Sequence, residues 1–375
     1  MPQVYRCLVV ALIALGLGGA CAPPAGPAPP SPTVAAPAAA APAQASAAPA
    51  AQVAAPTSAP REPERVTVAW VRSLNIAPYN VAVGRGYYTQ EGLAVETAEF
   101  ASTADVVSAL GTGQTDVNVG AISAGNFNAW QRGVKMYVVA ALSVYPAQGL
   151  MPTSVVTRKE LYDSGAVRGL PDLRGRAFAV NARGNITEYT LWRVLQRRDM
   201  GLDDLNTQIM GFPDMVAALA NGSVDGFIAS EPFGTIALDQ GTGARLEEDQ
   251  QTIGAVQFTH TLYSEQFADS RSDAAVRFLK ATLRASRELQ GTAWINDPSV
   301  AQILEAEIGF KAELLGRSIL PVFPTDLAAR LDDVEQMQEG LMRMGRLSYP
   351  APLDVRPFVN TALAQRAREQ LEAGR

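Results

Sequence analysis

Short apolar runs alternate with helix-like stretches along the first two thirds of the sequence. Residues 66–71 (VTVAWV) have the β-branched composition of a buried strand, residues 79–90 are expected to form a helix, and residues 93–100 alternate like a second strand. Strands that alternate with helices in this way are typical of a parallel sheet covered by helices. The pattern therefore predicts the α/β class.

One helix-and-strand unit occurs twice, at an offset of 109 residues. Residues 105–116 (DVVSALGTGQTD) and 214–225 (DMVAALANGSVD) both begin and end with Asp, and Gly113 and Gly222 stand where each helix should end. A repeat of more than about 50 residues indicates a duplicated folding unit rather than a solenoid. We therefore expect two similar α/β lobes with a cleft between them.

Helical spacing dominates the sequence from residue 272 onward. The helical stretches there are expected to pack around the two lobes and to link them. They cover residues 272–290, 297–309, 323–344 and 355–370. The predicted organisation is a signal peptide (1–20), a lipidated Cys21 with an Ala/Pro-rich tether (21–60), the first part of lobe 1 (61–145), lobe 2 (146–255), and a return to lobe 1 with the C-terminal helices (256–375).

The N-terminus has the layout of a secretory signal. Arg6 precedes an apolar run at residues 7–17 that is too short to span a bilayer, and small residues lead from there to Cys21. A Cys at the cleavage point resembles the lipobox of bacterial lipoproteins. A lipobox usually has Leu three residues before its Cys, whereas this chain has Gly18 there, so secretion without a lipid is the alternative. Residues 22–60 contain no charged residue and have the composition of a tether that would hold an anchored body off the membrane.

Composition argues against several classes of function. The net charge of -6 and the pI of about 5.1 argue against nucleic acid as a partner. His260 is the single histidine and both cysteines precede residue 22, so His-rich and thiolate metal sites are excluded from the folded body. The sequence contains no nucleotide-binding glycine motif and no nucleophile elbow. Nothing in the sequence supports an enzyme, a cofactor or a metal site, although a carboxylate-only metal site and Ser/His/Asp catalysis stay open as alternatives. We expect His260 to be a strand residue with satisfied hydrogen bonds rather than a general base.

Candidate binding residues follow the predicted strands, in the loops after Trp70, Gly120, Asn181 and Ala229. Ligands of open α/β sheets usually bind at the carboxyl ends of strands, where aromatic rings stack on flat ligands and amides or hydroxyls orient them. For each residue alone, core packing or helix capping explains the position equally well, and the grouping favours binding. The predicted ligand-binding residues are Trp70, Asn75, Tyr79, Asn80, Ser123, Asn126, Phe127, Tyr145, Asn181, Asn185, Thr187, Tyr189, Trp192, Glu231 and Phe233.

Three motifs resemble those of the periplasmic solute-binding proteins of ABC importers. The motifs are residues 79–95 (YNVAVGRGYYTQEGLAV), Gly113-x-x-Asp116 followed by Val119-Gly120, and Gly222-Ser-Val-Asp225 with Glu231-Pro232. The similarity is to the branch that contains sulfonate, taurine and nitrate binders, thiamine-pyrimidine binders and riboflavin binders. A suicidal thiamine-precursor synthase shares the fold of this branch.

The resemblance implies a type II periplasmic-binding-protein fold, with two α/β lobes, a hinge formed by crossover strands, and a helical C-terminal region. It implies a monomer that closes over one small-molecule ligand, docks on the permease and ATPase subunits of an importer, and catalyses no reaction. With a lipid on Cys21, the protein would be anchored at the extracytoplasmic face of the cell membrane.

The predicted cleft favours a neutral, flat ligand. Its loops contain the cations Arg72 and Arg183, whereas sulfonate or nitrate binding calls for cationic or strongly donating groups, and Glu231 would repel an anion. The aromatic candidates suit riboflavin first and a thiamine-type pyrimidine next; an aliphatic sulfonate, taurine or nitrate is the alternative. Two other classes are an enzyme like the thiamine-precursor synthase, which needs a cysteine-rich segment that this body lacks, and a sensory or adhesive lipoprotein.

Overall fold

The computed structural model describes residues 62–100 and 103–374, all within one compact unit that spans residues 58–375. The predicted signal peptide, the predicted lipidation site Cys21 and the predicted tether lie outside the described residues. In the described part, no helix is long and apolar enough to cross a bilayer. The described residues include both copies of the repeat and the C-terminal helical region.

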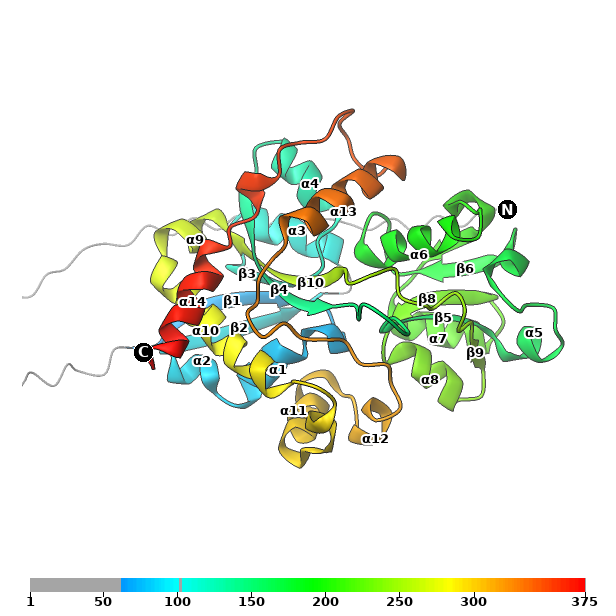
Figure 1. The fold of residues 1–375 in the computed structure, drawn as a ribbon, viewed down its shortest axis with the longest axis horizontal. Helices are drawn as coiled ribbons and strands as arrows, with labels where there is room; N and C mark the ends of the chain where they lie inside the picture. Colours follow the sequence, from blue (N-terminus) through cyan, green and yellow to red (C-terminus); the bar gives the residue numbers. More distant parts are fainter. Residues whose placement is uncertain (1–61, 101–102, 375) are drawn as a thin grey trace, which may run out of the picture. The chain divides into compact units, whose positions relative to one another are not determined.

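The first sheet has five strands and contains both the N-terminal strands and a later strand that returns to them (Figure 1). Its order is β2(Leu93–Glu99), β1(Glu64–Trp70), β3(Val117–Gly120), β10(Gln257–Ser264) and β4(Met136–Val144). β1 pairs in parallel with β2 and β3, whereas β10 pairs antiparallel with β3 and β4. β3, β4 and β10 are buried along nearly their whole length, which is expected of strands covered on both faces.

The second sheet repeats this arrangement with five strands from the middle of the chain. Its order is β7(Asn206–Ile209), β6(Ala177–Val180), β8(Gly226–Ser230), β5(Thr153–Arg158) and β9(Gly243–Arg245). β6 pairs in parallel with β7 and β8, and β5 pairs antiparallel with β8 and β9. The two similar α/β lobes are therefore confirmed. Each sheet is mixed rather than fully parallel, because its fourth strand runs in the opposite direction.

Helices surround both sheets. The first lobe has α1(Ala77–Gly84), α2(Tyr87–Gln90), α3(Thr103–Gly111), α4(Ala124–Gln131), α9(Glu265–Ser270) and α10(Ser272–Glu288). The second lobe has α5(Lys159–Asp163), α6(Ile186–Gln196), α7(Phe212–Ala220) and α8(Phe233–Asp239). The C-terminal region has α11(Pro298–Ile308), α12(Ala312–Leu315), α13(Leu331–Arg343) and α14(Ala362–Glu372). Single 3₁₀ turns are η1(Leu74–Ile76), η2(Leu170–Leu173), η3(Leu202–Asp204), η4(Ala293–Asn296) and η5(Arg356–Phe358).

The repeated motif forms the amino-terminal edge of the central strand in each lobe. The backbone N–H groups of Asp116 and Asp225 donate to Thr67 of β1 and Ala177 of β6, the parallel neighbours of the central strands, over 2.9 and 2.8 Å. Their carboxylates accept hydrogen bonds from Arg271 (2.9 Å) and Arg158 (2.7 Å). Both predicted helix-terminating glycines have positive φ angles, of 71° and 78°, which glycine adopts most easily. The repeat therefore builds the framework at the edge opposite to the carboxyl ends of the strands.

Three predicted helices differ from the structure, and the one expected at residues 355–370 forms η5 and then α14 from Ala362 onward. The helix expected at residues 79–90 is divided into α1 and α2, because Gly86 has a left-handed backbone conformation with φ of 68°. The helix expected at residues 323–344 begins only at Leu331. The segment before it follows β4 instead, and the backbone carbonyl of Val322 accepts a hydrogen bond from that strand over 2.9 Å. β4 is an edge strand, so its unpaired backbone groups are free to bond this segment. The segment therefore stays extended instead of forming a helix.

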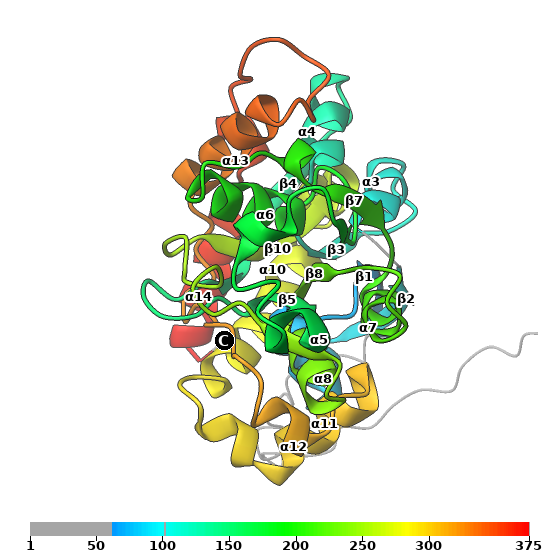
Figure 2. The same ribbon diagram turned by 90° about the vertical axis from the view of Figure 1, so that its right-hand side faces the viewer.

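The C-terminal region contacts both lobes. α13 packs against α4 of the first lobe and α6 of the second (Figures 1 and 2). Beyond α11, the Phe310 ring meets the Phe233 ring of α8 edge-on, with ring centroids 5.7 Å apart. These contacts connect the lobes in addition to the crossover segments that follow β4 and precede β10.

Candidate ligand-binding cleft

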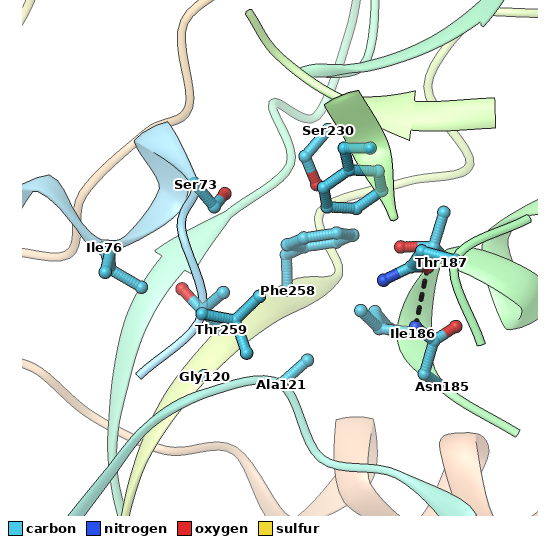
Figure 3. A pocket seen from close by; sticks show the side chains of 13 residues that line it. Ser73, Ile76, Gly120, Ala121, Asn185, Ile186, Thr187, Ser230, Phe258 and Thr259 are labelled. Carbon is cyan, nitrogen blue, oxygen red and sulfur yellow. Dashed lines mark hydrogen bonds between the residues drawn. The ribbon is translucent and has the colours of Figure 1, made fainter. Parts of the chain in front are cut away.

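A cavity of about 30 Å³ lies between the lobes at the carboxyl ends of the parallel strands (Figure 3). Each of the four loops predicted from the sequence contributes to its wall. The first lobe supplies Val71, Ser73, Ile76, Gly120, Ala121, Phe258 and Thr259, and the second supplies Asn181, Asn185, Ile186, Thr187, Phe212 and Ser230. Figure 3 shows side chains from the two lobes converging on this space from opposite sides.

The wall of the cavity is neutral. All of its lining residues are apolar, aromatic, hydroxyl or amide residues. Phe212 and Phe258 offer ring surfaces, and the hydroxyl and amide groups offer hydrogen bonds to a ligand. The two cations considered from the sequence do not line it: Arg72 forms two hydrogen bonds with Glu99, of 2.9 and 2.7 Å, and Arg183 is exposed. Such a wall favours a ligand without a full charge.

Helix capping fixes two of the lining side chains. Ser73 precedes η1 and its hydroxyl accepts from the Asn75 N–H (3.1 Å). Asn185 precedes α6 and its side-chain oxygen accepts from the Glu188 N–H (2.9 Å). The Asn185 amide also donates to the Asn181 side chain over 2.8 Å, the contact dashed in Figure 3. Caps at strand ends therefore place polar groups at the cavity in defined orientations.

Asn75 lies directly behind the cavity wall. Its amide donates to Ser73 Oγ (3.0 Å), and its backbone carbonyl accepts from Thr259 Oγ1 (2.9 Å). Ser143 of β4 completes the network, with its hydroxyl 2.7 Å from that of Thr259 and 3.3 Å from Asn75 Oδ1. All of these residues are buried. Asn75 therefore positions two lining hydroxyls and is not itself part of the wall.

Two predicted aromatic residues have the same supporting position. Tyr145 stacks on Phe258, with ring centroids 5.0 Å apart, and burial raises the pKa of its hydroxyl. That hydroxyl lies 2.8 Å from Thr153 Oγ1. Phe233 packs on Phe212, with ring centroids 5.3 Å apart. The two aromatic residues predicted from the sequence thus support the cavity wall from behind, and the rings that face the cavity are those of Phe212 and Phe258.

Glu231 is engaged inside the second lobe and does not line the cavity. Its Oε1 accepts from Ser154 Oγ (2.5 Å) and from the Arg245 guanidinium (2.7 Å). Its Oε2 accepts from the backbone and the hydroxyl of Thr235, over 3.1 and 2.8 Å. With its oxygens occupied in this way, the carboxylate helps to hold β5, β8, α8 and β9 together.

The other predicted residues also lie outside the wall. Trp70, Tyr79 and Asn80 are buried in the first lobe, with Tyr79 against Phe278. Ser123 and Asn126 form the cap of α4, and Phe127 packs on the core side of that helix. Tyr189 and Trp192 of α6 pack against α13. Of the fifteen predicted residues, the wall contains Asn181, Asn185 and Thr187.

The lobes touch beside the cavity. The backbone N–H of Ala124 donates to the carbonyl of Gly184 across the cleft, over 2.6 Å. On the same side, the Arg346 guanidinium forms hydrogen bonds of 2.9 and 2.6 Å with the buried carboxylate of Glu188. These contacts and the small cavity define a closed cleft.

Comparison with known proteins identifies the chain's family. A profile of the NMT1-like family matches residues 59–306, a range that includes the strands of both sheets. The chain belongs to the NMT1-like family. This NMT1-like protein is similar to the riboflavin-binding protein RibY of Chloroflexus aurantiacus, with 24% identity over 290 residues that cover 74% of this chain and 79% of that protein.

Solved structures show that the NMT1-like chain has the periplasmic-binding-protein fold that its motifs indicated. The nitrate-binding protein NrtA of Synechocystis PCC 6803 matches with a TM-score of 0.68 and 17% identity, over 83% of this chain and 90% of that chain. The alkanesulfonate-binding protein SsuA of Xanthomonas axonopodis pv. citri matches with a TM-score of 0.64 and 16% identity, over 80% of this chain and 99% of that chain.

Proposed function

We propose that this chain, the solute-binding component of an ABC importer, captures a flat, neutral heterocycle between its lobes and delivers it to a membrane permease. Riboflavin is the favoured ligand and a thiamine-type pyrimidine is the next. The observation that carries this proposal is the uncharged cavity wall, in which Phe212 and Phe258 provide ring surfaces from opposite lobes. The similarity to RibY, a riboflavin-binding protein by name, supports the same ligand.

Binding requires the cleft to open. Small-molecule sites occupy roughly 300–1,000 Å³, far more than the closed cavity of about 30 Å³. A ring entering the open cleft would stack against Phe258, which Tyr145 holds from behind. Closure would then bring Phe212 and the Asn185 amide onto the ligand from the second lobe. The chain is a binding protein rather than an enzyme, so closure leads to delivery and not to a reaction.

A small anion is the second candidate, in the form of an aliphatic sulfonate, taurine or nitrate. Two observations favour it: the closed cavity is small, and the amino end of α6 lies at its wall, where the helix dipole attracts negative charge. The solved neighbours NrtA and SsuA bind nitrate and alkanesulfonate by name. Because the wall is neutral and contains two phenylalanines, we rank a small anion second to the heterocycle.

The protein acts outside the cytoplasm, and we place it at the cell membrane through a lipid on Cys21 and the Ala/Pro-rich tether. Its partners would be the permease and ATPase subunits of the importer, and it would work as a monomer. Replacing Cys21 by Ser should release the protein from the membrane fraction in intact cells. Membrane retention of this variant would contradict the lipid anchor.

The ligand can be tested with the full chain purified from cells. The absorption spectrum is recorded first, and thermal unfolding is then followed with riboflavin, a thiamine-type pyrimidine, taurine and nitrate. A ligand at a hundred times its dissociation constant adds about 2.7 kcal/mol to the free energy of unfolding. A flavin spectrum, or stabilisation by riboflavin alone, is the expected result. Stabilisation by taurine or nitrate alone would overturn the heterocycle and keep the binding role.

A further inference from the structure

Two buried polar side chains on one face of the first sheet have no hydrogen-bond partner among the described residues. Both amide atoms of Asn118 and both ring nitrogens of His260 are unpaired, although the residues are 0% and 2% exposed. His260 lies in a strand as the sequence predicted, but its ring nitrogens have no partner in the described part of the chain, which corrects the expectation of satisfied hydrogen bonds. Buried polar groups in native proteins are nearly always paired, so two unpaired neighbours require an explanation.

The register of the sheet brings these side chains together. His260 on β10 pairs directly with Gly120 on β3, and Asn118 lies two residues before Gly120 on the same strand. Directly paired residues, and residues two apart on one strand, point to the same face. Asn118 and His260 therefore flank Gly120 on a single face of the sheet.

Gly120 connects this pair to the cleft. It lines the cavity between the lobes, and a Cβ atom added to it would lie only 3.1 Å from Asn118 Oδ1. The Asn118 side chain thus leans along β3 toward the carboxyl end of the strand, where the cavity lies. A side chain at position 120 would displace the amide or separate it from the cavity, and glycine leaves that approach open.

The protonation state of His260 decides which ligands the pair could bind. Burial, together with the positive charge of Arg330, lowers the pKa of His260 to about 3. At neutral pH its ring is uncharged, with one nitrogen as a donor and the other as an acceptor. Asn118 likewise offers both a donor and an acceptor. An inorganic anion has only acceptors and would leave the Asn118 oxygen and one His260 nitrogen unpaired.

We propose that Asn118 and His260 form a polar subsite of the cleft, which binds the inner edge of the ligand once the lobes have opened. The subsite selects an edge on which donors and acceptors alternate, such as that of a cyclic imide, amide or amidine. The inference rests on the proposed function and narrows its ligand class. A ligand edge would supply the partners that the two side chains lack among the described residues.

Apolar variants separate this role from a structural one. Asn118→Leu and His260→Leu should each weaken riboflavin binding about tenfold or more, since a lost hydrogen bond to a buried group has that effect. The ligand-free variants should be as stable as the wild type or more stable, because an unpaired polar group has been removed. His260→Gln keeps a donor and an acceptor and should retain more affinity than His260→Leu.

Thr261→Val provides the matched control. Thr261 is a buried neighbour of His260 on β10, its hydroxyl also lacks a partner among the described residues, and its side chain points to the opposite face of the sheet. This variant should change stability in the same direction as the others and should leave riboflavin affinity unchanged. The comparison isolates the face of the sheet that carries Asn118 and His260.

A second measurement uses the unmodified protein. His260 is the single histidine of the chain, so ¹⁵N-histidine labelling of the full chain without a histidine tag gives one imidazole to follow. Riboflavin should shift the ring nitrogen resonances into the range of hydrogen-bonded imidazole. An unshifted imidazole in the saturated complex would overturn the inference even if a leucine variant failed to fold.

The outcomes also distinguish a failure of the proposed subsite from a failure of the proposed function on which it rests. If wild-type protein binds riboflavin and the leucine variants bind it equally well, the subsite is wrong and the proposed function stands. If the wild type binds taurine or nitrate and neither riboflavin nor the pyrimidine, the proposed ligand class is wrong and the subsite falls with it.

Discussion

The two lobes have the same strand order but treat buried polar groups differently. In the second lobe, Glu231 and Arg245 are bonded to each other and to neighbouring hydroxyls. In the first lobe, Asn80, Asn118 and His260 are just as buried, and none of their side-chain polar atoms has a partner among the described residues. In the second lobe the Glu231 carboxylate is thus bonded on both oxygens, although Arg245 Nε has no partner among the described residues, whereas none of the side-chain polar atoms of these three first-lobe residues has one. The difference teaches that two copies of one strand order can bond their buried polar side chains differently.

The largest effect is expected from Glu231→Ala. The substitution leaves the guanidinium of Arg245 buried without its counter-charge, and breaking a buried ion pair in this way destabilises a protein by about 3–5 kcal/mol. Urea unfolding measures the change in the free energy of unfolding. The exposed pair between Glu99 and Arg72 is the control, and Glu99→Ala should lower stability by about 1 kcal/mol or less. Equal losses in both variants would show that the Glu231–Arg245 pair contributes no more to stability than an exposed ion pair does.

The next effect concerns the first lobe and pH. Because the pKa of folded His260 is lowered to about 3, the unfolded chain binds a proton below about pH 6.5 and the folded chain does not. Its contribution to stability is therefore present above pH 6.5 and is lost as the pH falls. The free energy of unfolding should drop by about 2 kcal/mol between pH 7 and pH 5. In His260→Gln this part of the pH dependence should disappear, and an unchanged slope would contradict the buried neutral imidazole.

Gly184→Ala tests how closely the lobes must approach. Gly184 has φ of 68°, and an added Cβ would lie 2.7 Å from the Cβ of Ala124 in the other lobe. Overpacking of this kind costs about 1–3 kcal/mol, so ligand affinity should fall by roughly tenfold as closure is impeded. Gly175→Ala is the matched control, since Gly175 has φ of 71° and open space around it. Both variants carry the same backbone strain, and a similar affinity in both would argue against the closed contact.

The smallest effect is expected from Arg346→Gln. Removing this guanidinium leaves Glu188 buried without a cation at the contact between α6 and the segment after α13. The closed form should lose about 1–2 kcal/mol relative to the open form, seen as faster ligand release in stopped-flow fluorescence. Arg356→Gln removes a cation from a fully exposed pair with Asp354 and should leave release unchanged. Release at the wild-type rate from both variants would show that Arg346 does not hold the lobes closed.

The sequence predicted the lobes well because the repeat is encoded locally. The Asp and Gly positions of residues 105–116 and 214–225 specify a helix end and a strand start without help from distant residues. The antiparallel strands were harder to predict, and β5 and β9 were missed. Their pairing joins segments far apart in the chain, and β9 has only three residues, Gly243–Arg245.

The cavity wall was predicted less well than the fold. Loop position and residue type favoured Tyr145 and Phe233, but neither indicates which ring faces the space and which supports it. Phe258 lines the cavity because β10 returns antiparallel beside β3 and presents its amino end to the cleft. That placement follows from the strand order, which the sequence does not reveal. Asn181, Asn185 and Thr187 could be located because they lie in the short segment between the end of β6 and the first turn of α6, which Asn185 caps.

The central claim is that a neutral cleft selects a flat heterocycle over an anion. Isothermal titration calorimetry of the full chain with riboflavin, repeated in excess taurine and in excess nitrate, tests it most directly. The account predicts saturable riboflavin binding at one site per chain, with an affinity that neither anion changes. No heat with riboflavin or a thiamine-type pyrimidine, together with saturable binding of taurine or nitrate, would contradict it.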